Sequence, residues 1–276
     1  KNDKCPPWSV QAKKIIYDIR SFFGQAIDCR RFPDFYLLSS CFKFLERILI
    51  NKSDGIVVLD ISAKEFLIKE YNYQKTCVVI PTSTDLYKYL PITENKSISN
   101  EIKFVYLGGA RYPYLPLHAL RFIKKFKDEG NNCSIDFINE REHYQIEKLI
   151  NISGLPKEKC KVFHVEASQV PQKLKEYDCG LVFIDSGKWL RMCSPTKIGE
   201  YLASGLHIVG LEGINVLDRL ANDFSCADLI YLRQNHKNVS SFEFNSKEIK
   251  KNIFSSKRIK KSRAIAEELF DLNKAN

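Results

Sequence analysis

The feature that most constrains the fold is an alternation, from Leu45 onward, of helical stretches with short runs rich in β-branched residues. Such runs, separated by helices, are typical of βαβ units in a parallel sheet. In the early chain a helix is expected to end near Ile50, and a capping box formed by Ser62 and Glu65 is expected to begin another helix. The strands predicted around the second helix cover residues 55–59 and 76–80. The chain is therefore predicted to be an α/β protein.

A second and longer series follows a turn-rich, polar stretch between about 82 and 100. Five strands with intervening helices are expected there, which is the sequence form of a Rossmann-like domain. The strands are predicted at 103–107, 133–138, 161–165, 180–184 and 207–211, and the helices at 116–129, 142–152, 171–177 and 195–204. The tail from about Asn245 is expected to form one or two helices.

Several classes of protein are disfavoured by composition. No apolar run approaches the roughly 18 to 20 residues of a membrane span, and no signal peptide is evident. The nine cysteines form no CxxC pair and are odd in number, which favours reduced thiols in the cytosol over a zinc site or disulfide framework. We expect a cytoplasmic protein without a metal site. Because the chain starts at Lys1 and its single methionine is Met192, we also expect an N-terminal segment to be missing.

The chain is basic, with 43 Lys and Arg against 33 Asp and Glu and a net charge of +10. This balance indicates anionic partners: phosphates, nucleic acid or an acidic membrane surface. Eight basic residues between 245 and 263 stand against Glu248 alone. Two uses of this tail stay open, a solvated helix face and contact with an anionic membrane surface from the cytoplasmic side. No RNP, KH or helix-turn-helix pattern is present, so nucleic acid is not the expected partner.

Candidate ligand-binding residues follow the first strand of the second series. In open parallel sheets, ligands bind beyond the carboxyl ends of the strands, where backbone amides point at anions. Gly108 and Gly109 would let the backbone approach a phosphate, and the Arg111 guanidinium can bind a phosphate with two hydrogen bonds. A tight turn with a solvated arginine is the alternative.

The segment 194–205 carries a second set of candidates. Ser194 suits a helix N-cap, Pro195 the first helical position and Gly205 the C-terminal end. Lys197 would lie in the first turn, where its charge opposes the helix dipole unless an anion lies between them. Glu200, one turn further on, can accept hydrogen bonds from a ribose diol. The spacing alone also fits a Lys–Glu surface pair.

This segment has a wider resemblance. The stretch "SPTKIGEYLASGLHIVG" resembles the donor-site helix of the large GT-B glycosyltransferase family that includes bacterial lipopolysaccharide, capsule and glycan transferases. Three further stretches are similar to segments of that family in the same order, so the resemblance covers about 17–211. They read "NKSDGIVVLDISAKEFLIKEYNYQKTCVVIPTSTD", "IKFVYLGGARY" and "KVFHVEASQVPQKLKEYDCGLVFI".

The resemblance implies a role for each candidate. Arg111 would contact the donor diphosphate, Lys197 the same group or the transferred sugar, and Glu200 the ribose hydroxyls. The remaining donor-binding candidates would offer amides, hydroxyls or backbone to the phosphate and the base; they are Ser194, Pro195, Thr196, His164 and Val165. Arg, Lys and a helix N-terminus would stabilise the leaving nucleoside diphosphate without a metal or other cofactor. The chain also has no Asp-x-Asp pair.

The same resemblance implies two Rossmann-like domains, of which the first is incomplete. Residues 1–85 would be a remnant of the acceptor-side domain, 86–240 the nucleotide-sugar-binding domain, and 241–276 C-terminal helices that return to the first domain. The implied reaction transfers a sugar, with retention, from a UDP- or GDP-sugar to a saccharide or lipid-linked saccharide in cell-surface polysaccharide or lipopolysaccharide synthesis. No catalytic base is identified.

Departures from the family pattern keep a second function open. Met192 stands where many relatives have a second glutamate that contacts the donor sugar, 112–117 lacks the expected lysine, and His207 replaces a frequent proline. A catalytically inactive nucleotide-binding or scaffold protein of the same fold is the alternative.

Overall fold

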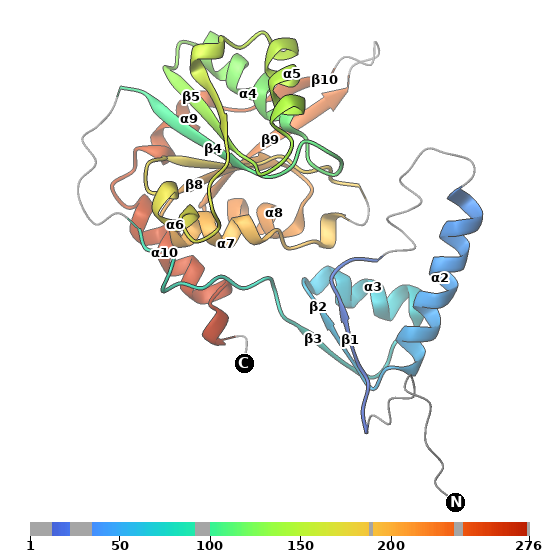
Figure 1. Ribbon diagram of the computed structural model, residues 1–276. Coiled ribbons are helices and arrows are strands. Elements are labelled where there is room, and N and C mark those ends of the chain that lie inside the picture. Colours follow the sequence, from blue (N-terminus) through green and yellow to red (C-terminus); the bar gives the residue numbers. More distant parts are fainter. Residues whose placement is uncertain (1–12, 23–34, 92–99, 188–189, 235–239, 275–276) are drawn as a thin grey trace, which may run out of the picture. The chain divides into compact units, whose positions relative to one another are not determined.

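The computed structural model describes residues 13–22, 35–91, 100–187, 190–234 and 240–274. The chain divides into two compact units, Lys1–Ile80 and Pro81–Asn276 (Figure 1).

The first unit contains a three-stranded parallel sheet in the order β1-β2-β3. Its elements are β1 (Ile16–Ile19), α2 (Phe35–Lys52), β2 (Gly55–Val58), α3 (Ile61–Tyr71) and β3 (Thr76–Val79). The expected βαβ unit is present, but the expected capping box is wrong. Asp60 is the N-cap of α3, and its side chain accepts a hydrogen bond from Ser62 N at 2.9 Å. Because α3 already begins at Ile61, the amide of Ser62 lies in the first turn and itself needs an acceptor.

The second unit is built on a seven-stranded sheet in the order β10-β9-β8-β7-β4-β5-β6. All neighbouring strands are parallel except β10, which is antiparallel to β9. The strands are β4 (Ile102–Leu107), β5 (Cys133–Ile138), β6 (Cys160–Phe163), β7 (Cys179–Val182), β8 (His207–Leu211), β9 (Ala227–Gln234) and β10 (Ser240–Glu243). The six parallel strands have the 3-2-1-4-5-6 order of a Rossmann sheet, so the strand order reverses between β4 and β7.

Helices cover both faces of this sheet (Figure 1). One core lies between the sheet and α4 (Pro116–Asp128), α5 (His143–Ser153) and α9 (Ser246–Ile253). The other lies between the sheet and α6 (Val170–Leu174), α7 (Thr196–Ala203), α8 (Asn215–Asn222) and α10 (Arg258–Leu269). The central parallel strands are buried on both faces, which explains their nearly continuous apolar sequence.

The five strands expected from sequence are present as β4 to β8, but β9 and β10 extend the sheet beyond them. Asp228 interrupts the apolar run of β9. It is tolerated because the ring of His207, which is buried at the start of β8, lies 2.7 Å from its carboxylate (Nε2 to Oδ2). Asn252 of α9 donates a second hydrogen bond to Asp228 at 3.1 Å.

The basic tail forms α9 and α10 within the second unit, where α10 packs against α7. Two of its arginines bind backbone carbonyls: Arg258 donates to Ile253 O, and Arg263 donates to three carbonyls described below. The other six basic residues of the tail are exposed, and they are Lys247, Lys250, Lys251, Lys257, Lys260 and Lys261.

Candidate nucleotide-binding site

The loop of residues 108–111, called the glycine loop from here on, lies where the strand order of the sheet reverses. Gly108 and Gly109 directly follow β4, and neither has the left-handed φ that would by itself require glycine. Their small size serves close packing instead. A Cβ atom on Gly108 would lie 2.7 Å from Lys197 Nζ, and one on Gly109 would lie 2.9 Å from Glu142 Oε2. The loop backbone is therefore in contact with a cation at one residue and a carboxylate at the next.

Lys197 projects from the first turn of α7 and is only 8% exposed. Its ammonium donates a hydrogen bond to Leu107 O and lies 4.2 Å from the centroid of the Tyr114 ring and 5.8 Å from that of Tyr106. Burial lowers the pKa of Lys197 to about 8, while the neighbouring Glu200 carboxylate opposes this shift. Lys197 thus places a poorly hydrated cation against the glycine loop, where an anion would stabilise it.

A carboxylate absent from the sequence prediction lies against the same loop. Glu142 immediately precedes α5 and accepts a hydrogen bond from Ala110 N at 2.6 Å through Oε2. Its other oxygen, Oε1, forms an ion pair with Arg111 Nε at 3.1 Å. The side chain of Glu142 is 17% exposed, whereas that of Arg111 is 81% exposed. The guanidinium predicted to bind the diphosphate is therefore paired within the protein.

Asn139, also absent from the prediction, ties together the loops that follow β4, β5 and β6. Its side-chain amide donates to Gly108 O at 2.9 Å, and its side-chain oxygen accepts from Glu142 N at 2.5 Å. Its backbone N–H donates to Phe163 O, the last residue of β6, at 3.0 Å. The backbone of Glu142 is consequently fixed relative to the glycine loop.

Tyr201 fastens α7 to β4. Its hydroxyl accepts a hydrogen bond from Leu107 N at 2.9 Å, and its fully buried ring lies over Gly180 of β7. A Cβ atom on Gly180 would lie 2.3 Å from Tyr201 Cδ2, so glycine is required for this approach. The contact sets the position of the helix that carries Lys197 and Glu200.

The start of α7 differs from the expectation. Pro195, not Ser194, is the N-cap, and no side chain of the described chain caps the helix. Ser194 is buried and is engaged with Thr82, whose hydroxyl donates to Ser194 O at 2.5 Å and lies 2.7 Å from Ser194 Oγ. The hydroxyl of Ser194 is therefore held by the chain itself, while Thr196, which begins the helix, is exposed.

Glu200 lies one turn beyond Lys197 and is half-buried. Burial raises the pKa of Glu200, and a hydrogen bond from Tyr89 together with the charge of Lys197 partly offsets that rise. The pKa of Tyr89 is raised as well, by burial first and then by the Glu200 carboxylate. The predicted acceptor of ribose hydroxyls is thus bonded to a tyrosine hydroxyl.

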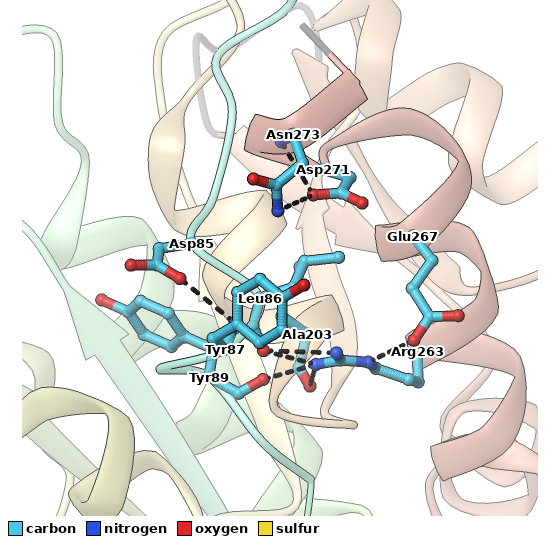
Figure 2. A network of polar contacts seen from close by, with 9 residues as sticks. All are labelled: Asp85, Leu86, Tyr87, Tyr89, Ala203, Arg263, Glu267, Asp271 and Asn273. Carbon is cyan, nitrogen blue, oxygen red and sulfur yellow. Dashed lines mark hydrogen bonds and ion pairs between the residues drawn. The ribbon is translucent and has the colours of Figure 1, made fainter.

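Tyr89 belongs to a segment that α10 holds in place. Arg263 donates to Tyr89 O at 2.6 Å, to Leu86 O at 3.2 Å and to Ala203 O at 3.4 Å (Figure 2). Its Nε also pairs with Glu267 at 2.7 Å. The guanidinium of Arg263 therefore joins α10, the end of α7 and the segment that carries Tyr89.

His164 and Val165 follow β6 at the outer edge of the sheet, two strands away from β4. His164 Nε2 lies 3.0 Å from Glu166 Oε1, and both side chains are exposed. Val165 packs against the core on the α7 side. The structure thus brings Gly108, Gly109, Arg111 and Lys197 together, with Glu200 one helical turn away, and leaves His164 and Val165 in a separate position at the same edge.

Two kinds of feature were not found among the described residues. These residues contain no cluster of three or more His, Cys, Asp or Glu side chains arranged to hold a metal ion. Nor do the described parts include a helix with both the length and the apolarity of a membrane span.

A polar hollow lies away from the glycine loop, on the face of β4, β5 and β6 near α6. Its charged groups are largely paired within the hollow: Asp136 accepts from Tyr177 at 2.8 Å, and Glu101 pairs with Lys159 at 2.7 Å. This hollow is not the predicted site.

Comparison with known proteins defines the class of fold. The sequence matches no protein-family model and no curated protein. Among solved structures, sucrose-phosphate synthase from Thermosynechococcus elongatus aligns with a TM-score of 0.66 at 10% identity, over 94% of this chain and 64% of that protein. HepE of Anabaena, solved with UDP and glucose, aligns with a TM-score of 0.62 at 12% identity, over 95% of this chain and 69% of HepE.

A third similar structure is the pneumococcal O-GlcNAc transferase GtfA with UDP and GlcNAc. It has a TM-score of 0.54 at 14% identity, and the alignment covers 83% of this chain and 45% of GtfA. The chain thus spans between 45% and 69% of the length of these three proteins. The likeness shows the fold: the chain is an α/β protein of the GT-B class with an incomplete first domain, as expected from its sequence.

Proposed function

We propose that the second unit binds a nucleoside-diphosphate sugar at the carboxyl edge of its sheet and that the protein transfers the sugar to a hydroxyl acceptor. One observation carries this proposal. At the reversal point of a Rossmann-ordered sheet, where ligands of such sheets bind, a glycine pair contacts the buried ammonium of Lys197.

The chemistry of the site suits a departing nucleoside diphosphate. Glycosyl transfer leaves negative charge on the diphosphate, and cations in a poorly hydrated site stabilise such charge far better than cations in water. Lys197 and Arg111 would supply that stabilisation, with the amides of the glycine loop and of the first turn of α7. In this proposal Glu200 accepts hydrogen bonds from the ribose diol once Tyr89 releases it. No metal is needed for these steps.

The donor and the acceptor are inferred from different observations. HepE and GtfA were both solved with UDP, so a UDP-sugar is the first donor to test, followed by a GDP-sugar. We propose a saccharide or lipid-linked saccharide acceptor in cell-surface polysaccharide synthesis. The six exposed lysines of the tail suit contact with an anionic membrane, which would place the protein on the cytoplasmic surface.

The proposal is tested by titrating the purified protein with UDP, GDP, ADP and CMP in a calorimeter, and then repeating the titration with Glu200→Ala. We expect binding of one nucleoside diphosphate, weakened in the variant by about 1–3 kcal/mol, the scale for losing hydrogen bonds to a charged group. Glu268→Ala removes an exposed carboxylate from α10 and serves as the control. Equal affinity of Glu200→Ala and the parent would remove Glu200 from the donor site.

A second candidate is a nucleotide-binding protein that does not transfer sugars. It is favoured by Met192, a buried apolar side chain where the family pattern has a glutamate. Incubation with UDP-sugars and detection of released UDP separates the two candidates. Nucleotide binding without release of UDP from any sugar donor, in the presence of saccharide acceptors, would favour the binding protein.

A further inference from the structure

We infer that Glu142 is an internal anion that competes with the diphosphate for the glycine loop, and so sets the affinity of this chain for its donor. The inference rests on the proposed function, because it concerns the same loop. It adds a residue that sets the affinity for the diphosphate and that the family resemblance did not indicate.

The contacts of Glu142 are those expected of a bound phosphate. One carboxylate oxygen accepts from Ala110 N at 2.6 Å, and the other pairs with Arg111 Nε at 3.1 Å. The carboxylate also lies where a side chain on Gly109 would be. A backbone amide, a guanidinium and a glycine that admits close approach are together the elements of an anion site, and Glu142 fills that site from within the chain.

A diphosphate and this carboxylate cannot both use these groups. The Ala110 N–H provides one proton for a hydrogen bond, and two anions at hydrogen-bonding distance from it would repel each other strongly in a poorly hydrated site. The backbone of Glu142 is fixed by Asn139, whereas its side chain is partly exposed. The side chain of Glu142 therefore rotates toward solvent when the diphosphate enters and returns when it leaves.

This competition lowers the apparent affinity for the diphosphate. The apparent dissociation constant increases in inverse proportion to the fraction of molecules in which the loop is vacant. One charge-assisted hydrogen bond and a partly exposed ion pair favour the occupied loop by about tenfold. Removal of the charge at Glu142 is thus expected to tighten diphosphate binding by about tenfold.

The test compares Glu142→Gln and Glu142→Ala with the parent protein and with Glu140→Gln. Glu140 is a matched control, because it carries the same charge in the same loop and pairs with Arg141 at 3.0 Å instead of with Arg111. Inorganic pyrophosphate, UDP and uridine are titrated into each protein by calorimetry. We expect both Glu142 variants to bind pyrophosphate and UDP about tenfold more tightly, with uridine unchanged and Glu140→Gln like the parent.

A second comparison shows whether the effect passes through Arg111. In Arg111→Met, the further change Glu142→Gln should tighten binding by less than about threefold, since one of the two contacts of the carboxylate is already gone. Circular dichroism and thermal midpoints of the free proteins establish that each variant is folded.

The outcomes separate this inference from the proposed function. Equal or weaker pyrophosphate binding by folded Glu142→Gln would overturn the inference, and UDP binding by the parent would still support the donor site. Tighter pyrophosphate binding without any response to UDP would support the internal anion and count against a nucleotide donor. An equal gain in affinity in Glu140→Gln would show that the effect comes from the net charge of the loop, and would also overturn the inference.

Discussion

Replacement of Lys197 by methionine should stabilise the unliganded protein, although Lys197 lies in the proposed site. The side chain is 8% exposed, and burial lowers its pKa from 10.5 to about 8. A shift of this size corresponds to about 3 kcal/mol of unfavourable free energy for keeping the ammonium charged in the folded state at pH 7. Methionine has a similar volume and carries no charge.

The replacement also removes a favourable contact. The hydrogen bond from the ammonium to Leu107 O is lost, at a cost of about 1 kcal/mol. The net expectation at pH 7 is a gain of about 1–2 kcal/mol in the free energy of unfolding. For a domain of this size the gain corresponds to an increase of about 2–8 °C in the thermal midpoint.

The gain should depend on pH in a defined direction. The folded-state pKa of Lys197 lies below its unfolded value, so between about pH 8 and 10.5 the unfolded state binds more protons than the folded state. In that window the parent protein gains stability relative to the variant as pH rises. Below pH 8 the lysine is charged in both states, and the full cost remains. The advantage of the variant is therefore largest at pH 7 and shrinks by pH 10.

Urea unfolding of Lys197→Met and the parent at pH 7 and pH 10 measures this difference. Lys161→Met, which removes an exposed lysine from β6, shows how much of any change comes from net charge alone. A variant less stable than the parent at pH 7 would mean that Leu107 O and the tyrosine rings more than offset the cost of burial. An advantage that does not change with pH would show that the pKa of Lys197 is not lowered.

Three further results are expected. UDP affinity should fall above about pH 8, because binding requires the charged form of Lys197. Lys197→Met should bind UDP weakly at every pH, and calorimetry across pH 6.5–9.5 measures the affinity of both proteins. Glu200→Gln should lose the preference for UDP over 2′-deoxy-UDP, about tenfold in the parent, and an unchanged preference would place the ribose elsewhere. Arg263→Met should lower the free energy of unfolding by about 2–3 kcal/mol, since three backbone carbonyls lose a donor. Lys260→Met, which removes an exposed lysine, should leave the free energy of unfolding unchanged, and equal urea midpoints for the two variants would refute the stabilising role of Arg263.

The sequence predicted β8 from its nearly continuous apolar run, since every residue of that strand is buried, and β5 from its alternation of buried and half-buried residues. The predicted strands 133–138 and 207–211 coincide with β5 and β8. β9 and β10 were not predicted. In β9, contacts with distant residues decide which side chains are tolerated. Asp228 in β9 is stabilised by His207 and Asn252, which are 21 and 24 residues away in the chain, so no local pattern reveals that this strand tolerates a carboxylate.

The helix starts show the same limit. The Ser62 capping box was a reasonable local motif, but Asp60 supplies a stronger acceptor two residues earlier. Ser194 has the composition of an N-cap, yet its hydroxyl is engaged with Thr82, 112 residues before it. Tertiary packing decides whether a side chain caps its own helix or bonds to a distant residue. Neighbouring residues in the sequence do not reveal that packing.

The residues of the candidate site, too, were only partly predictable from the sequence. Gly108, Gly109, Arg111 and Lys197 could be proposed because they occupy positions that parallel sheets use for anions, and their contact with a donor remains a prediction. The residues that the sequence did not indicate depend on neighbouring loops. Asn139 and Glu142 also follow a predicted strand, so the rule that singled out the glycine loop would have pointed to them if applied to every strand end.

The charges near the glycine loop are balanced within the protein. Lys197 and Arg111 contribute two positive charges, and Glu200 and Glu142 balance them with two negative ones. Each carboxylate has a further internal donor, Tyr89 for Glu200 and Ala110 N for Glu142. In the proposed complex the diphosphate therefore displaces Glu142 from Ala110 N, whereas the ribose diol takes the place of Tyr89 at Glu200. The variants Glu142→Gln and Glu200→Gln are therefore expected to differ in kind: loss of the first carboxylate strengthens binding of any diphosphate, whereas loss of the second weakens only the binding of ligands that carry a ribose diol.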